Sequence, residues 1–341
     1  MRTSVLEAAV KPTDAESSTS ADKRGRACGP DLGTSDRALL AVGQFLLGQD
    51  YRFTTISPAS HRRVNARDFG PPTLRDIFGW SRPFEKDDVP GTVLSDLRAA
   101  GALQEHGKLR SGLRFSSLDD QLFAHSAFPT DGADAVFFGP DTYRFARTIR
   151  DAVSSLTPTR NMRVLDIGAG SGAGGIYAGK LLKGASPHIV LSDINREALR
   201  LSRINAELNG IPNVRVIESD LYSSIEGHFE LIVSNPPYLV DPLARLYRHG
   251  GGELGFALSV DIAVQGVEKL APGGRLILYT GSAIVDGTDL LQEALAQGLA
   301  GRGVRWSYEE IDPDVFGEEL EVMPYDRADR IAVVAATIER P

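Results

Sequence analysis

The sequence predicts a doubly wound α/β domain with a mostly parallel sheet, preceded by a smaller and mainly helical domain. From Arg163 onward, short apolar runs alternate with segments of helical periodicity, a pattern typical of parallel strands joined by helices. The 341 residues are enough for one large domain and a smaller one. We therefore predict a disordered tail over residues 1–34, an amino-terminal domain over 35–130 and a ligand-binding domain over 131–341.

Composition excludes several classes of protein. A net charge of −8 argues against a protein that coats nucleic acid, because phosphate binding requires clustered Lys and Arg. The single cysteine, Cys28, rules out a disulfide framework, and the six scattered histidines do not suggest a metal site. The sequence has neither an apolar stretch of about 18 residues nor the apolar core of a signal peptide, so we expect no membrane span and a cytoplasmic location.

The amino-terminal domain begins with helical patterns and ends with a hairpin pattern. Ser35 is the predicted N-cap of the first helix, and Gly101 ends the third in the manner of a C′ glycine. Helices followed by a hairpin resemble a winged-helix layout, so we expect this domain to position a substrate or partner. The predicted elements are helices over 36–47, 72–78 and 91–100 and hairpin strands over 109–115 and 121–126.

An unusually aromatic segment, 135–146, follows this domain. In one interpretation Phe137, Phe138, Tyr143 and Phe145 fill a junction between the domains. In the other, Phe-Gly-Pro-Asp-Thr-Tyr at 138–143 forms a lid over a pocket and opens a helix that runs to Ser154. Both interpretations remain open.

A glycine-rich loop follows the first strand of the large domain, over 163–167. Glycines let the backbone turn sharply and approach a ligand, and the helix that follows offers free N–H groups at its amino terminus. The second strand, over 188–192, ends at Asp193. This residue lies about 20 positions after the loop, where an acidic side chain can bind both hydroxyls of a ribose.

The loop also fits a dinucleotide-binding fingerprint, Gly168-x-Gly170-x-x-Ala173. Asp166 precedes this loop, and its charge would repel a pyrophosphate but would hold the ammonium group of a ligand. A dehydrogenase is therefore disfavoured.

The later strands continue the alternation and bring the total to seven, the last two antiparallel. Asp220 follows the third strand and could accept a hydrogen bond from an adenine amine. The loop over 245–255 contains three consecutive glycines, and we interpret it as a flap on the substrate side, the alternative being an ordinary long loop. The predicted strands cover 214–217, 230–234, 275–279, 304–311 and 330–337, with helices over 259–270 and 289–299.

Ser-Asn-Pro-Pro-Tyr at 234–238 ends the fourth strand. Two consecutive prolines cannot continue a ladder, so the chain must leave the sheet at the end where ligands bind. The Asn235 side chain and the Pro236 carbonyl would offer acceptors, and the Tyr238 ring a flat face beside them. This arrangement suits a planar amide or amino nitrogen, whose lone pair then points at an electrophile. The alternative is a rigid turn with an Asn cap.

Over about 136–337 the chain resembles the class I S-adenosylmethionine-dependent methyltransferases, which have a Rossmann-like fold. The matching motifs are Val-Leu-Asp-Ile-Gly-Ala-Gly-Ser-Gly at 164–172, Asp193, Ser-Asp-Leu at 219–221 and Asn-Pro-Pro-Tyr at 235–238. The last motif is similar to that of the branch that methylates planar nitrogens. That branch includes the release-factor glutamine methyltransferases and enzymes that act on exocyclic amines of adenine or guanine.

The resemblance implies S-adenosylmethionine as cofactor and in-line displacement at its methyl group, without a metal. The glycine loop with Asp166 would hold the methionine part, Asp193 the ribose and Asp220 the adenine. The implied cofactor-binding residues are Asp166, Gly168, Gly170, Gly172, Asp193, Ile194, Asp220, Leu221, Asn235, Phe138 and Tyr143. The implied catalytic residues are Asn235, Pro236, Pro237 and Tyr238.

The acceptor stays open between a protein amide and a small biosynthetic amine or amide. Methylation of RNA or DNA is a further alternative, which the net charge disfavours. A third possibility resembles the natural-product enzymes that form azetidine-2-carboxylate from S-adenosylmethionine and release methylthioadenosine. A cofactor-binding module without catalysis is the least consistent with an intact Asn-Pro-Pro-Tyr.

Overall fold

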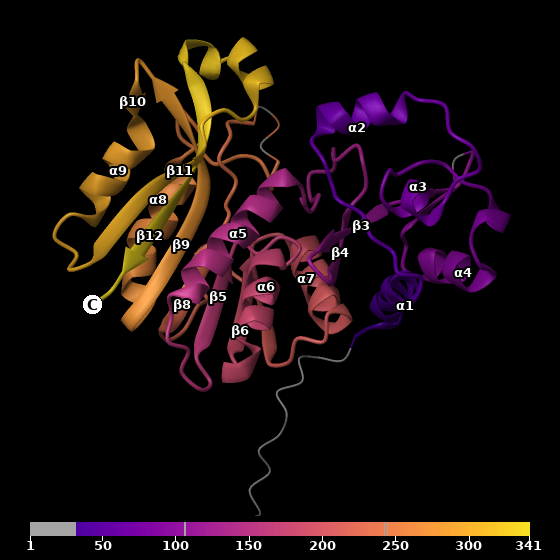
Figure 1. Cartoon of the computed structure of the whole chain (residues 1–341), viewed down its shortest axis with the longest axis horizontal. Helices are drawn as coiled ribbons and strands as arrows, with labels where there is room; N and C mark the ends of the chain where they lie inside the picture. The colour runs from indigo at the N-terminus through magenta and orange to yellow at the C-terminus, as the bar shows by residue number, and fades with distance from the viewer. Residues whose placement is uncertain (1–31, 106, 242, 244) are drawn as a thin grey trace, which may run out of the picture.

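The computed structural model describes residues 32–105, 107–241, 243 and 245–341. Most of the predicted tail, including Cys28, lies outside the described residues. Figure 1 shows a central sheet flanked by helices, with a smaller body of helices and a hairpin beside it. In the described part of the chain, no helix has the length and apolar character needed to cross a membrane.

The large sheet confirms the predicted fold class. Its strand order is β11-β12-β9-β8-β5-β6-β7, and short β10 pairs with β9 as an eighth member. The neighbours from β9 to β7 are parallel, whereas β12 is antiparallel to both β9 and β11. The strands are β5 (Arg163–Ile167), β6 (His188–Asp193), β7 (Val214–Glu218), β8 (Phe229–Ser234), β9 (Leu270–Val285), β10 (Thr288–Asp289), β11 (Arg305–Asp312) and β12 (Arg330–Glu339).

Helices cover both faces of this sheet (Figure 1). Consecutive strand residues point to opposite faces, so Val164 packs beneath α5 and α6 while Leu165 packs beneath α8 and α9. The helices are α5 (Pro140–Ser154), α6 (Ala173–Leu181), α7 (Arg196–Leu208), α8 (Ala257–Gly266) and α9 (Leu290–Leu299), with 3₁₀ turns η2 (Lys183–Ala185), η3 (Val267–Lys269), η4 (Gly317–Glu321) and η5 (Tyr325–Arg327).

Two boundaries in this domain differ from the prediction. Helix α8 ends at Gly266 rather than at residue 270, and β9 already begins at Leu270. The Pro-Gly-Gly break at 272–274 therefore lies inside a strand, where the register between β8 and β9 shifts. A β-bulge accommodates residues that would otherwise end the strand.

The amino-terminal body contains the three predicted helices and two that the sequence did not reveal. Its elements are α1 (Thr34–Gly48), α2 (Pro58–Asn65), α3 (Leu74–Phe78), η1 (Lys86–Asp88), α4 (Gly91–Ala99), β1 (Leu103–Gln104), β2 (Arg110–Ser111), β3 (Leu113–Leu118) and β4 (Gln121–Ser126). Ser35 was wrongly predicted as an N-cap, because α1 starts after Gly33 and the Ser35 hydroxyl donates to Ala100 O at 3.3 Å.

The β3–β4 hairpin joins the two bodies. Its outer strand β4 packs on α7, where Asn205 Oδ1 accepts from Ala124 N at 2.8 Å and Asn205 Nδ2 donates to Ala124 O at 2.9 Å. Leu201 and Leu208 of α7 belong to the hydrophobic core of the amino-terminal body. The domain boundary near residue 130 thus remains a prediction, since the two cores share a helix.

Strands β5 and β8 are neighbours in the middle of the sheet. The strand order continues from β5 to β6 and β7 on one side, and from β8 to β9 on the other. Ligands bind at such a switch point, at the carboxyl ends of the strands. The order of the strands therefore brings the loops after β5, β6, β7 and β8 to one place.

Candidate active site

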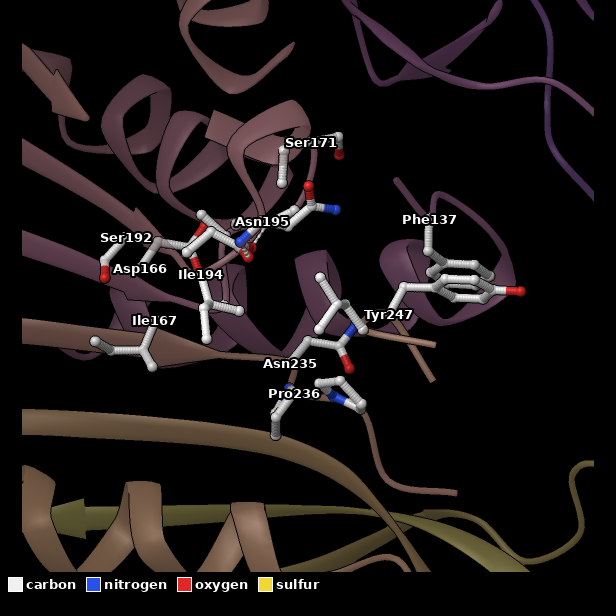
Figure 2. Close-up of a pocket in the computed structure, with 18 of the residues that line it drawn as sticks. Phe137, Asp166, Ile167, Ser171, Ser192, Ile194, Asn195, Asn235, Pro236 and Tyr247 are labelled. Carbon is white, nitrogen blue, oxygen red and sulfur yellow. Dashed lines mark hydrogen bonds between the residues drawn. The ribbon is translucent and has the colours of Figure 1, made fainter. Parts of the chain in front are cut away.

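A cavity lies at the carboxyl ends of these four strands (Figure 2). Its wall contains the glycine loop, the residues after β6 and β7, the turn after β8 and part of the following loop. It is lined by Ala135, Val136, Phe137, Thr142, Phe145, Asp166, Ile167, Gly168, Ala169, Gly170, Ser171, Ala173, Gly174, Ser192, Asp193, Ile194, Asn195, Ala198, Ser219, Asp220, Leu221, Asn235, Pro236, Pro237, Leu246, Tyr247, Leu258 and Ile262.

The glycine loop leaves its backbone open to the cavity. Gly168 and Gly170 have φ of +66° and +54°, and a Cβ on either would meet no other atom within 4 Å. Gly172 differs, because it is the residue before α6 and a Cβ there would press on Ile176 and Ser202. Gly172 is not part of the cavity wall; the absence of a side chain lets α6 pack closely, and its contact with a cofactor stays a prediction.

Asp166 is buried at the base of the cavity. Its Oδ2 accepts a hydrogen bond from Gly175 N at 2.7 Å. Burial raises the pKa of Asp166 to about 7; the Gly175 N–H opposes this rise, and the nearby charge of Asp193 adds to it. A cation that binds beside the Asp166 carboxyl group would stabilise its charged form.

Asp193 connects the end of β6 to the glycine loop. Its Oδ2 accepts from Gly170 N at 2.8 Å and its Oδ1 accepts from Asn195 N at 2.8 Å. Burial also raises the pKa of Asp193. Exposed Ile194 and Asp220 lie in the same wall, so the four strands bring together most of the residues predicted to contact a cofactor.

Asn235 and Pro236 face the cavity, as Figure 2 shows. Among the described residues, nothing forms a hydrogen bond with the Asn235 side chain, although this side chain is half-buried. Its amide atoms are open to the cavity, because neither is among the buried side-chain atoms that lack a partner. An unpaired amide beside a buried proline is therefore available for a ligand.

Tyr238 is not among the residues that line the cavity, and its role as a flat face beside the acceptor stays a prediction. The side chain is buried, and its hydroxyl donates to Asp141 Oδ2 at 2.7 Å. Its ring packs edge-on to Phe316 and fills the space that a side chain at Gly281 would need. Burial, followed by the charge of Asp141, raises the pKa of Tyr238 well above its ordinary value.

Asp141 is the centre of a buried network at the start of α5. Besides Tyr238, it accepts from Tyr279 Oη at 3.0 Å and from Arg144 Nη1 at 3.2 Å. Arg144 also donates to Asp312 at 2.8 Å. These bonds tie the first turn of α5 to the turn after β8, which fixes the backbone that carries Asn235.

Two further residues of the aromatic segment, Phe138 and Tyr143, lie in the domain junction, and their contact with a cofactor stays a prediction. Phe138 is 1% exposed and packs against Phe123 and His125 in the domain junction. Tyr143 contacts Phe138 edge-on, and its hydroxyl accepts from Thr55 N at 3.0 Å. Neither residue lines the cavity, so the interpretation as a junction holds for these two rings.

Phe137 and Tyr247 instead form an aromatic wall at the mouth of the cavity (Figure 2). Their rings are parallel to within 3°, with centroids 6.4 Å apart. Tyr247 Oη donates to Thr130 O at 2.7 Å, and Gly139 leaves room for the Phe137 ring to fold back. No periodicity or motif in the sequence marks Tyr247 or its neighbour Leu246 as part of the site.

The glycines of the loop over 245–255 serve close packing. A Cβ on Gly250 would overlap Gly255 O and lie 2.6 Å from Pro237 O. The backbone at Gly250 therefore packs closely against the Pro-Pro-Tyr backbone. The loop holds Leu246 and Tyr247 against the cavity, which agrees with its interpretation as a flap on the substrate side.

The Tyr238→Phe variant is expected to lower the free energy of unfolding by about 1–3 kcal/mol, because it removes a donor from a buried carboxylate. Urea unfolding measures this value. The matched control is Tyr308→Phe, which removes a similar 2.7 Å bond to Asp289 at a half-buried position and should cost less. A Tyr238→Phe variant as stable as the wild-type protein would contradict the structural role of the hydroxyl.

The described residues contain no group of three or more His, Cys, Asp or Glu side chains that could hold a metal ion. The chemistry of the site is that of a pocket with an open glycine loop, a buried carboxylate (Asp166), a half-buried carboxylate (Asp193) and an unpaired amide.

Comparison with known proteins agrees with this site. Residues 150–298 match the model of the methyltransferase small domain family. The chain is 37% identical over 142 residues to the release factor glutamine methyltransferase of Deinococcus radiodurans, covering 37% of this chain and 48% of that protein. It is 40% identical over 100 residues to a putative protein N5-glutamine methyltransferase of Methanocaldococcus jannaschii, covering 29% and 49%.

A third relative is named as a methyltransferase of ribosomal RNA rather than of protein. The ribosomal RNA large subunit methyltransferase I of Aeromonas salmonicida is 33% identical over 169 residues, covering 47% of this chain and 40% of that protein. The chain thus spans less than half the length of each of these three relatives. The match over residues 150–298 indicates a methyltransferase domain there, in agreement with the resemblance of the sequence to the class I S-adenosylmethionine-dependent methyltransferases and with the cofactor which that resemblance implies.

Proposed function

We propose that the chain is an N-methyltransferase acting on a planar amide or amino nitrogen of a protein or a small biosynthetic substrate. One observation carries this proposal. The unpaired side chain of Asn235 and the adjoining Pro236 line the same cavity as Asp166 and Asp193. The groups proposed to bind the acceptor and the cofactor therefore line one cavity.

The cofactor-binding residues divide by chemistry. Asp166, with the open backbone of Gly168 and Gly170, suits the ammonium and carboxylate ends of the methionine part. Asp193 suits the ribose hydroxyls, and Asp220 an adenine amine. Exposed Ile194 and neighbouring Leu221 add the apolar surface on which a base packs.

The cofactor supplies an electrophilic methyl group on a sulfonium. Asn235 Oδ1 and the Pro236 carbonyl would accept the N–H bonds of the acceptor and direct its lone pair toward that methyl group. As positive charge develops on the nitrogen, its N–H bonds to these acceptors strengthen, which stabilises the transition state more than the ground state.

The charge of the chain favours a protein or small-molecule acceptor over a nucleic acid. A net charge of −8 repels a polyanion, and phosphate contacts dominate nucleic-acid affinity. The names of the relatives include both protein glutamine and ribosomal RNA methyltransferases.

A second candidate is intramolecular cyclisation of the cofactor, and the aromatic wall of Phe137 and Tyr247 favours it. These rings narrow the side of the cavity where an acceptor would enter. In this reaction the amino nitrogen of the cofactor attacks its own aminopropyl chain, and the C–S bond breaks. The products are azetidine-2-carboxylate and methylthioadenosine.

The nucleoside product distinguishes the two candidates. Purified protein is incubated with S-adenosylmethionine alone and then with cell extract, and the product is followed by mass spectrometry. S-adenosylhomocysteine that forms only with extract supports methyl transfer, and fractionation of the extract leads to the acceptor. Methylthioadenosine formed without an acceptor would overturn the methyltransferase proposal. Asp193→Ala is the control, since a variant impaired in cofactor binding should form either product more slowly.

A further inference from the structure

Arg114 is a buried cation without a carboxylate partner. It lies on β3 opposite His125 of β4 and is 4% exposed. Its Nε donates to Ser126 O at 3.1 Å, and no acidic residue of the described chain acts on its charge. Arg82 provides the contrast, because this buried arginine pairs with Asp76 at 2.8 Å.

The two terminal nitrogens of Arg114 make no hydrogen bond with the described residues. They are also not among the buried side-chain atoms that are both unpaired and closed to solvent. Part of their surface therefore contacts solvent. A guanidinium presents parallel N–H donors that match the two oxygens of a carboxylate or phosphate.

The tyrosines and histidines around Arg114 are neutral at neutral pH. Burial raises the pKa of Tyr51 and of Tyr143 above the ordinary value of a phenol. Burial lowers the pKa of His61 to about 4 and that of His125 well below its ordinary value, and the charge of Arg114 lowers both further. Burial lowers the pKa of Arg114 itself only to about 10, so its positive charge remains uncompensated.

Hydrogen bonds organise the polar side chains around this charge. Ser116 Oγ lies 2.7 Å from His125 Nε2 and 2.5 Å from Thr55 Oγ1, and Thr55 N donates to the hydroxyl of Tyr143. The Nδ1 atoms of His61 and His125 have no partner in the described part of the chain, although both side chains are fully buried. Buried polar atoms without partners indicate a missing ligand or ordered water.

We propose that this group of residues, the Arg114 cluster (Thr55, His61, Arg114, Ser116, His125 and Tyr143), binds a small oxyanion, either a carboxylate or a phosphate. An unpaired buried charge destabilises the folded protein, and a bound anion removes that cost. The cluster is separate from the cofactor cavity, since none of its members lines that cavity. The cluster contacts the aromatic segment, because the His125 ring stacks on the Phe138 ring with centroids 5.1 Å apart.

Thermal unfolding of the full-length protein in matched salts tests this proposal. At equal pH and ionic strength, sodium acetate or sodium phosphate should raise the unfolding temperature of the wild-type protein by about 2 °C or more above its value in sodium chloride. This increase should level off as the anion concentration rises. The Arg114→Gln variant should lose this saturating increase. Saturation by acetate alone identifies a carboxylate site, and saturation by phosphate alone identifies a phosphate site.

Arg82→Gln is the matched control, because it removes a buried arginine that already has a carboxylate partner, and it should keep the wild-type response. Phosphate also stabilises proteins by exclusion from their surface, an effect that neither saturates nor depends on Arg114. Equal shifts in wild type and Arg114→Gln would therefore overturn the proposal. If Arg114→Gln does not fold, Arg114→Lys keeps the charge without the paired donors and should bind roughly tenfold more weakly; unchanged affinity would reject the site.

Discussion

Replacing Asn235 with alanine is expected to lower turnover about 10²–10³-fold, while the dissociation constant for S-adenosylmethionine changes less than about twofold. The variant removes a preorganised acceptor whose bond to the substrate nitrogen strengthens as that nitrogen becomes positive, and the loss of one such group has this magnitude. Asn235 also has no partner within the described protein, so its removal should leave the fold intact. Formation of S-adenosylhomocysteine with the acceptor from the extract measures turnover, and calorimetry measures cofactor binding.

Asp193→Ala is the complementary variant. Its carboxylate holds Gly170 N and Asn195 N at the cofactor side of the cavity, so its loss should weaken cofactor binding. Asn235→Ala with wild-type turnover would reject the acceptor role of this amide. Asn235→Ala with a strongly weakened cofactor affinity would instead assign the amide to the cofactor site.

The predictions that succeeded rest on local sequence. Each parallel strand is a short apolar run, and each is followed by a residue whose type is unusual at that place, such as Asp193, Asp220 or Asn235. Because parallel strands place their carboxyl ends at one edge, the sequence order was enough to bring these residues together. The structure confirms that they line one cavity.

The side-chain positions that the sequence did not reveal depend on partners far along the chain. The direction of the Tyr238 side chain is fixed by Asp141, 97 positions earlier, and nothing in Asn-Pro-Pro-Tyr reports that bond. Phe138 turns into the junction because the β3–β4 hairpin presents Phe123 and His125 to it. Tyr247 reaches the cavity through the close packing of its loop on Pro237. Alternation and motifs locate the backbone, but they do not determine the packing of aromatic side chains.

The cofactor-free protein is expected to lose stability as pH rises from about 4 to about 7, through Asp166. Its pKa is about 7 in the folded protein and 3.8 when unperturbed, so the folded state binds the extra proton in this interval. Stability from this group is therefore fully present below pH 4 and is lost by pH 7, by at most about 4 kcal/mol at 1.36 kcal/mol per pKa unit. Urea unfolding across this range measures the slope.

The cofactor should reverse this dependence, because its ammonium group stabilises the charged form of Asp166. Below pH 7 the free enzyme must release a proton to bind the cation, so cofactor affinity should increase up to about tenfold per pH unit toward neutrality. Asp166→Asn, which mimics the protonated carboxyl, should bind weakly and without this slope, and its cofactor-free form should no longer lose stability toward pH 7 through this group. Asp220→Asn, which removes an exposed carboxylate from the same wall, should keep the slope because Asp166 remains. A wild-type affinity that does not change between pH 5 and 7 would show that Asp166 does not contact the ammonium group.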